Sequence, residues 1–138
     1  MPNGKRPPQK NRPQEESPQT SNESLQKIIE NGDVEELNKQ ANAWGEYFAQ
    51  GGERDRLSSS QIRNVLDRLQ RMRTFDFREL QLLRPLLAYA AGRHRGKVMD
   101  LQKVSDRAIC MVKDNRQFVN FRNFFEAIVA YHRYHGGR

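Results

Sequence analysis

The chain has 138 residues, a formal net charge of +7 at pH 7 and a hydrophobic fraction of 36%. This length suits one domain with one modest core, and the sequence contains no apolar run of the roughly 18 to 20 residues that cross a bilayer and no secretory signal. A single cysteine, Cys110, excludes an internal disulfide and a multi-cysteine metal site. We therefore predict a cytoplasmic protein with no membrane partner and an unreactive thiol.

The charge is divided unevenly along the chain. From Glu53 to Arg138 there are 18 Lys plus Arg against 9 Asp plus Glu, and 15 of the 18 basic residues are Arg. Residues 13–52 carry two Lys against eight acidic residues. Because Arg suits bidentate contacts with phosphate and stacking on bases, the basic half predicts a polyanionic partner. The alternative is an Arg-rich surface that is only solvated.

The first 22 residues are rich in Pro, Gln, Asn and Ser and show no apolar periodicity, which predicts a disordered tail followed by one domain over residues 23–138. A short helix is expected over 24–31. Asp33 then caps a second helix that ends at Gly51. Trp44 and Phe48 lie on its apolar stripe, so we interpret them as core or subunit interface and not as a stacking platform for bases.

The most clearly marked helix start is at Ser58. Gln61 stands three residues later and completes a capping box, and an apolar stripe from Ile62 to Met72 follows. Arg63 sits at the flank of that stripe, near a helix start whose backbone N–H groups suit a phosphate. We therefore predict Arg63 as an anion-binding residue.

A second cap pair, Asp76 and Glu79, starts the next predicted helix. Gly92 is expected to end it, and Pro85 removes one backbone hydrogen bond, which predicts either a kink or a division into two helices. The predicted helix runs through Leu82, Leu83, Leu86, Leu87 and Tyr89 to Ala91.

A short basic turn is expected over residues 92–97, between two glycines. It carries Arg93, Arg95 and Lys97, which could lie against a phosphodiester chain. The alternative is a solvated loop in which Arg93 or Lys97 binds the C-terminal carbonyls of a helix.

The last two predicted helices cover 98–114 and 115–138. The apolar face of the final helix is built from Phe118, Phe121, Phe125 and Ile128, whereas Arg122 and Arg133 lie on its opposite side. These two arginines could contact a partner or form ordinary ion pairs with Glu126. Because no segment alternates with a period of two, the fold class is predicted as all-α, a compact bundle of about five helices with a disordered N-terminal tail.

No catalytic constellation is visible. The sequence has no Gly-rich phosphate loop, no nucleophile elbow and no zinc-ligand spacing. His132 and His135 are three residues apart, but without a carboxylate partner we interpret them as half-buried aromatic-like residues and not as metal ligands. No Arg precedes a His at the spacing of a helical ribonuclease. We predict no enzyme activity, no catalytic residue, no metal and no cofactor.

Three segments resemble, in order, the small subunit of the type III-A CRISPR interference complex, the Csm complex. They are 57–64 (LSSSQIRN), 86–93 (LLAYAAGR) and 121–138, with FEAIVAYHRYHGGR at its end. The resemblance spans residue 57 to the C-terminus and leaves the Pro/Gln-rich tail outside. It implies a non-catalytic helical protein whose copies stack head to tail beside the backbone subunits. It also implies that RNA cleavage belongs to those backbone subunits, and DNA cleavage and cyclic oligoadenylate synthesis to the large subunit.

The partners implied are the guide RNA, the target RNA, the backbone and large subunits, and further copies of this chain, either head to tail or as a homodimer. Contacts would be made to phosphates without sequence readout, because base pairing with the guide supplies the specificity. Arg63 and Arg93 lie in the family-like motifs, and the others are chosen by charge and expected exposure. The complete set of candidate RNA-binding residues is Arg63, Arg93, Arg95, Lys97, Arg54, Arg56, Arg122 and Arg133. The alternative function is a helical adaptor between proteins that does not bind RNA directly.

Overall fold

A computed structural model describes residues 16–52 and 55–138. The secondary structure of these described residues is entirely helical, which confirms the predicted all-α class. It consists of α1 (Asn22–Ile29), α2 (Val34–Ala49), the 3-10 helix η4 (Ser59–Ile62), α3 (Arg63–Arg71), α4 (Phe77–Gln81), α5 (Leu83–His94), α6 (Lys97–Met111) and α7 (Asn115–Tyr134). None of these helices is long and apolar enough to cross a membrane.

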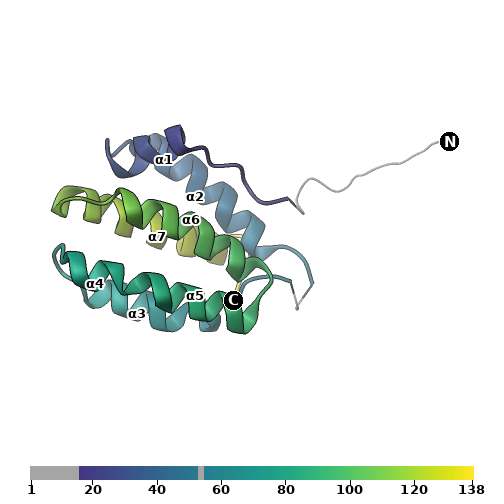
Figure 1. Cartoon of the computed structure of the whole chain (residues 1–138). Coiled ribbons are helices and arrows are strands. Elements are labelled where there is room, and N and C mark those ends of the chain that lie inside the picture. Colours follow the sequence, from purple (N-terminus) through teal and green to yellow (C-terminus); the bar gives the residue numbers. More distant parts are fainter. Residues whose placement is uncertain (1–15, 53–54) are drawn as a thin grey trace.

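The helices form three layers (Figure 1). Helices α1 and α2 lie on one side, α6 and α7 lie in the middle, and α3, α4 and α5 lie on the other side. The middle layer contributes to the core along the whole length of α7, whose buried apolar residues are Phe118, Phe121, Phe124, Phe125 and Ile128. The predicted apolar face of the last helix is thus confirmed, and it explains why α7 is covered from both sides.

Helices α2 and α7 approach each other very closely at Gly45. A Cβ atom on Gly45 would lie 2.6 Å from both the backbone N of His132 and the Cβ of Tyr131. Only glycine leaves enough room for such a crossing. Trp44 and Phe48 flank this point and are buried, with ring centroids 5.4 Å apart, so the prediction that they belong to the core is confirmed.

The predicted helix starts are present. The carboxylates of Asp33 and Asp76 each accept a hydrogen bond from the backbone N–H three residues later, and Ser58 and Gln61 form the capping box. The structure also defines the continuity of two helices. The capping box opens one 3-10 turn before α3 begins, and the segment containing Pro85 is divided into α4 and α5 at Leu82. Pro85 is the third residue of α5, where no intrahelical N–H bond is needed, so of the two alternatives the division is observed.

The predicted end of one helix at Gly92 is wrong. Helix α5 continues through Gly92 to His94, and the turn consists only of Arg95 and Gly96, with φ angles of +57° and +60°. The predicted helix also runs through Leu82 and Tyr89. Both are exposed, Tyr89 to 66%, whereas Leu83 and Leu87 face the core.

The segment before α1 packs against the domain. Thr20 is buried, and its hydroxyl accepts a hydrogen bond of 2.9 Å from Nε1 of Trp44. Arg107 of α6 donates to the carbonyl oxygen of Thr20 at 2.9 Å and to Oδ1 of Asn22 at 2.7 Å. These contacts hold Thr20 and Asn22, both within the predicted tail, against α2 and α6. Residues 1–15 lie outside the described residues.

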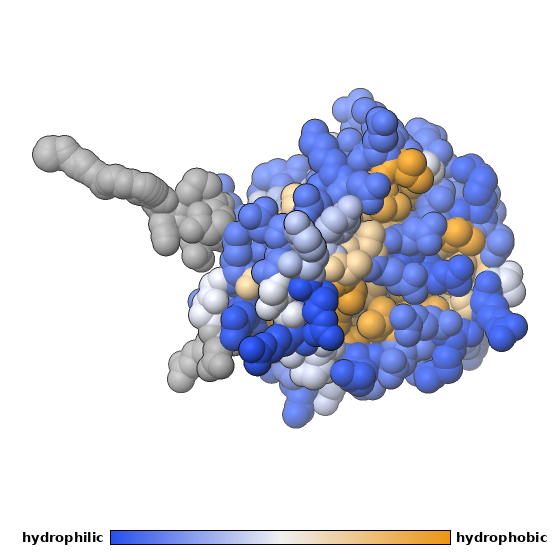
Figure 2. Space-filling view, turned by 180° about the vertical axis from the view of Figure 1, so that it is seen from behind, coloured by the Kyte–Doolittle hydropathy of each residue, from blue (hydrophilic) through white to orange (hydrophobic). Residues whose placement is uncertain are grey.

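The exterior is mostly hydrophilic. Figure 2 shows a face on which hydrophilic residues predominate, with smaller apolar areas near its middle. Among the described residues, the exposed large apolar side chains are spread over the fold: Val34, Phe77, Leu82, Tyr89 and Tyr134. Cys110 is exposed on α6 and is not part of a disulfide.

Candidate nucleic-acid interface

Arg63 is the first residue of α3 and is exposed between two hollows of the surface. The larger, which we name the α5 hollow, has a volume of about 470 Å³ and separates the η4–α3 segment from the second half of α5. Its polar and aromatic lining consists of Ser60, Gln61, Arg63, Asn64, Tyr89, Arg93 and His94. The sequence motif containing Arg63 and the motif containing Arg93 are therefore joined in one hollow.

The smaller hollow, which we name the α7 hollow, has a volume of about 240 Å³ and lies between α3 and the end of α7. Arg63 lines it from one side, and Arg133 and Arg138 line it from the other, with Asp67 as the acidic residue. Three guanidinium groups beside one carboxylate leave an excess of positive charge. Such a surface attracts an anion, and exposed guanidinium groups are well suited to phosphate.

The predicted phosphate site at the backbone of the helix start is not available. The N–H of Gln61 donates to the carbonyl oxygen of Ser58 at 2.9 Å, and the N–H of Ser60 donates to the Ser58 hydroxyl at 3.3 Å. The capping box thus uses these N–H groups itself. Positive charge in the two hollows comes from side chains.

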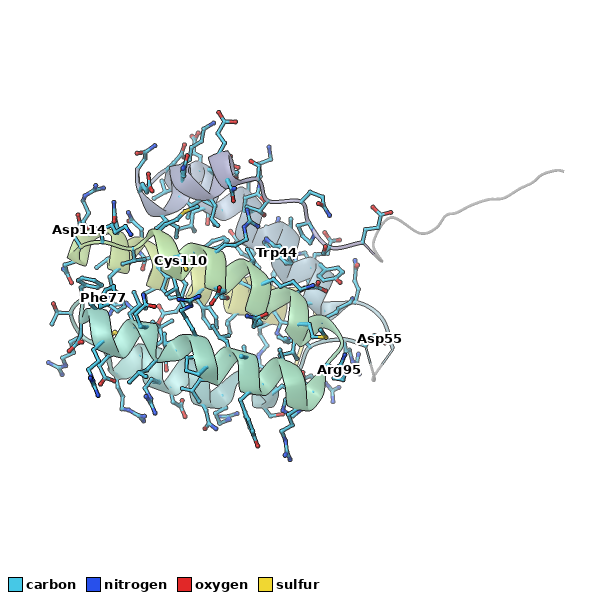
Figure 3. The ribbon with its side chains drawn as sticks, in the orientation of Figure 1. Trp44, Asp55, Phe77, Arg95, Cys110 and Asp114 are labelled. Atoms are coloured by element: carbon cyan, nitrogen blue, oxygen red, sulfur yellow. The ribbon has the colours of Figure 1, made fainter. Side chains whose placement is uncertain are left out.

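Arg95 lies just beyond the α5 hollow. Its backbone is left-handed, which non-glycine residues adopt at some cost in energy, and its N–H donates to the carbonyl oxygen of Ala91 at 2.8 Å. The side chain is exposed at the end of the bundle that also holds Asp55 (Figure 3). Arg56 is half-buried in the loop before η4, and Arg54 lies outside the described residues.

Lys97 does not belong to the exposed surface, which corrects its choice as an RNA-binding candidate. Its ammonium group is buried and donates to the carbonyl oxygens of Tyr47 and Gln50, at 2.6 and 2.9 Å. It also lies 4.3 Å from the centroid of the Tyr47 ring. Lys97 therefore binds the C-terminal carbonyls of α2, as the alternative interpretation of the basic turn proposed.

Arg122 has a comparable internal role. Its Nη1 donates to the carbonyl oxygen of Met72 at 3.0 Å, and its guanidinium carbon lies 5.4 Å from the Phe118 ring centroid. The side chain is half-buried at the C-terminal end of α3. This contact joins α7 to α3. Arg122 lines neither hollow, whereas Arg133 lines the α7 hollow.

The two histidines of α7 have separate partners. His132 is buried, and its Nε2 donates to the carbonyl oxygen of Leu57 at 2.8 Å. Burial lowers the pKa of His132; the bond to Leu57 opposes this effect and the charge of Arg133 adds to it. His135 contacts Oδ1 of Asn42 at 2.7 Å. Within residues 16–52 and 55–138, no group of three or more His, Cys, Asp or Glu could hold a metal ion.

Tyr89, His94 and Arg138 are among the lining residues of the hollows that sequence reasoning did not select. Tyr89 and Arg93 are four residues apart, the spacing that places two side chains on one face of a helix. That spacing was a usable signal, but the sequence prediction named Tyr89 only as a residue of the helix. Arg138 reaches the α7 hollow only because the chain turns back after α7, where the N–H of Gly137 donates to the carbonyl oxygen of His132 at 2.8 Å.

Comparison with known proteins identifies the family. A family model described as Csm2 Type III-A matches residues 31–138, which include α2 and every later helix and both hollows. Neither a curated protein nor a solved structure matches the chain. The matched segment is most of the chain and contains the three motifs whose resemblance was noted in the sequence. The chain therefore belongs to the Csm2 family of type III-A CRISPR systems, the non-catalytic small subunit of the Csm complex.

Proposed function

We propose that this small subunit binds guide RNA and target RNA through their phosphates, and that Arg63, Arg93 and Arg133 are its principal contacts. The observation that carries the proposal is the position of Arg63 between two hollows, each of which adds further exposed guanidinium groups. Arg95 extends the same surface. Contacts of this kind hold a strand without reading its sequence.

The charges also favour self-association of the subunit. The α1–α2 layer carries Lys27 and Lys39 against six acidic residues, whereas residues 56–95, which form the α3–α5 layer, carry nine Arg against three acidic residues. These layers lie on opposite sides of α6 and α7 (Figure 1). Copies that stack head to tail would bring unlike charges together, and a heterologous contact of that kind builds a filament. Such an assembly would line the backbone subunits of a cytoplasmic complex.

The RNA-binding part is tested by reversing Arg63 and Arg93 together to Glu in the full chain. We expect the affinity for single-stranded RNA to fall at least tenfold at moderate salt, since two phosphate contacts are lost and two repulsions are added. The measurement is fluorescence anisotropy of a labelled RNA across a salt series. In the milder Arg63→Gln/Arg93→Gln variant, the plot of log affinity against log salt should become less steep, with the magnitude of its slope reduced by about 1.4.

The matched control is Lys27→Glu/Lys39→Glu, which changes the net charge by the same amount on exposed positions of the opposite layer. It should bind RNA nearly as the unmodified chain does. If both double variants lost the same affinity, only net charge would matter and the assignment of the hollows would be wrong. If the unmodified chain bound no RNA at any salt concentration but still entered the complex, the adaptor function would replace RNA binding.

A further inference from the structure

One aromatic side chain stands out among the exposed apolar residues. Tyr89 is 66% exposed and lines the α5 hollow. Two other exposed aromatic residues, Phe77 and Tyr134, line neither hollow. An aromatic ring left in water beside several cations is available to a ligand that offers both a flat face and negative charge.

The surroundings of Tyr89 supply the remaining contacts for a nucleotide. Arg93 follows it by one helical turn, so both side chains are on one face of α5. Arg63 lines the same hollow from the start of α3, and Ser60 and Asn64 add a hydroxyl and an amide. The volume of about 470 Å³ falls within the range of roughly 300 to 1,000 Å³ typical of small-molecule pockets.

We propose that Tyr89 is a stacking platform for an unpaired base of the bound RNA strand, while Arg63 and Arg93 hold the flanking phosphates. The inference rests on the proposed RNA-binding function and deepens it. A base inside a continuous duplex is already stacked on its neighbours, so only a single-stranded or splayed-out nucleotide can reach the ring. Stacking tolerates any sequence because every base has an aromatic face.

The test compares two single-stranded RNAs of equal length, one with all its bases and one with abasic sites, against full-length variants. We expect Tyr89→Ala to lose roughly 5- to 150-fold in affinity for the complete RNA, which is the usual range for one stacked base. Affinity for the abasic RNA should not change. Tyr89→Phe should keep the affinity, because the ring is retained.

The matched control is Tyr134→Ala, which removes an exposed tyrosine that lines neither hollow. It should leave both affinities unchanged. A second readout is Tyr89→Trp, whose exposed indole fluorescence should be quenched by the complete RNA and much less by the abasic one. The other tryptophan, Trp44, is buried and serves as an internal reference.

The possible results distinguish base stacking on Tyr89 from the proposed phosphate binding. If Tyr89→Ala bound the complete RNA as well as the unmodified chain, while Arg63→Glu/Arg93→Glu lost affinity, phosphate binding would stand and stacking would be overturned. Equal losses of Tyr89→Ala on both RNAs would also overturn stacking, because the effect would then not depend on bases. If the unmodified chain bound neither RNA, the proposed function itself would fail.

Discussion

At the scale of single residues, His132 links the core to the candidate interface. Its ring is buried, Nε2 donates to Leu57, and a Cβ on Gly137 would lie 2.2 Å from Nε2. The turn that carries Arg138 into the α7 hollow therefore packs directly on the imidazole. A change in the charge of this ring would disturb both the core and that turn.

The lowered pKa of His132 predicts a pH dependence of stability. Below the ordinary pKa of about 6.5, the unfolded chain takes up a proton that the folded chain excludes. The free energy of unfolding should therefore fall as the pH decreases from about 6.5 through the lower pKa of folded His132. Urea denaturation at pH 7.5 and 5.5 measures the effect, and it should be smaller in His132→Gln, which keeps an N–H donor for Leu57. An equal decrease in both proteins would contradict the assignment to His132.

Some contacts of single residues could be predicted from the sequence, and others could not. The caps at Asp33, Ser58 and Asp76 were predicted correctly because a cap depends only on residues a few positions apart. Lys97 was misassigned because its partners, Tyr47 and Gln50, lie about fifty positions earlier in the chain. The sequence offered binding to helix C-terminal carbonyls as an alternative, but it could not show that the end of α2 lies beside Lys97.

At the scale of elements, the division between α4 and α5 decides which side chains face outward. The sequence prediction left open whether Pro85 kinks one helix or divides two, and it did not assign Tyr89 to a face of the helix. The break at Leu82 restarts the phase, so that Leu83 and Leu87 face the core and Tyr89 faces the α5 hollow. Pro85 signalled the break, but the resulting rotation depends on how α5 packs on α3 and α6.

The close contact between α2 and α7 at Gly45 predicts how a substitution there changes stability. Gly45→Ala should lower the free energy of unfolding by about 1 to 3 kcal/mol, because the added methyl group must displace the backbone of α7. Chemical denaturation measures the loss. Gly92→Ala is a matched control in α5, where a Cβ meets nothing within 4 Å, and it should raise stability by about 0.5 to 1 kcal/mol. Unchanged stability of Gly45→Ala would show that the two helices separate at little cost.

At the scale of the whole molecule, the uneven charge of the sequence becomes two oppositely charged layers. The sequence alone predicted that the ends of the chain differ in charge, but not that α6 and α7 separate the two groups. This arrangement predicts that Glu35→Lys/Glu46→Lys, at exposed positions of α2, will lower the number of copies in a complex reconstituted on guide RNA. Native mass spectrometry counts the copies.

A rescue experiment tests whether the loss of copies is due to lost charge complementarity. Adding Arg71→Glu and Arg78→Glu to the same chain reverses exposed positions of the opposite layer and restores the complementarity between neighbouring copies. The copy number should then recover. If the Glu35→Lys/Glu46→Lys variant assembled to the full copy number, head-to-tail stacking through these layers would be ruled out.

The pairing of α2 with α7 also affects the order in which the molecule can fold. These two helices share the closest packing of the core, yet more than sixty residues separate them along the chain. Ribosomes add about 5 to 20 residues per second, so α2 waits several seconds for α7 to be synthesised. During that interval α2 can pack on α1, with which it is also in contact, but Trp44 and Phe48 lack the cover that α7 provides. We therefore expect cooperative folding to be completed only after α7 is synthesised, together with the α7 hollow that α7 lines.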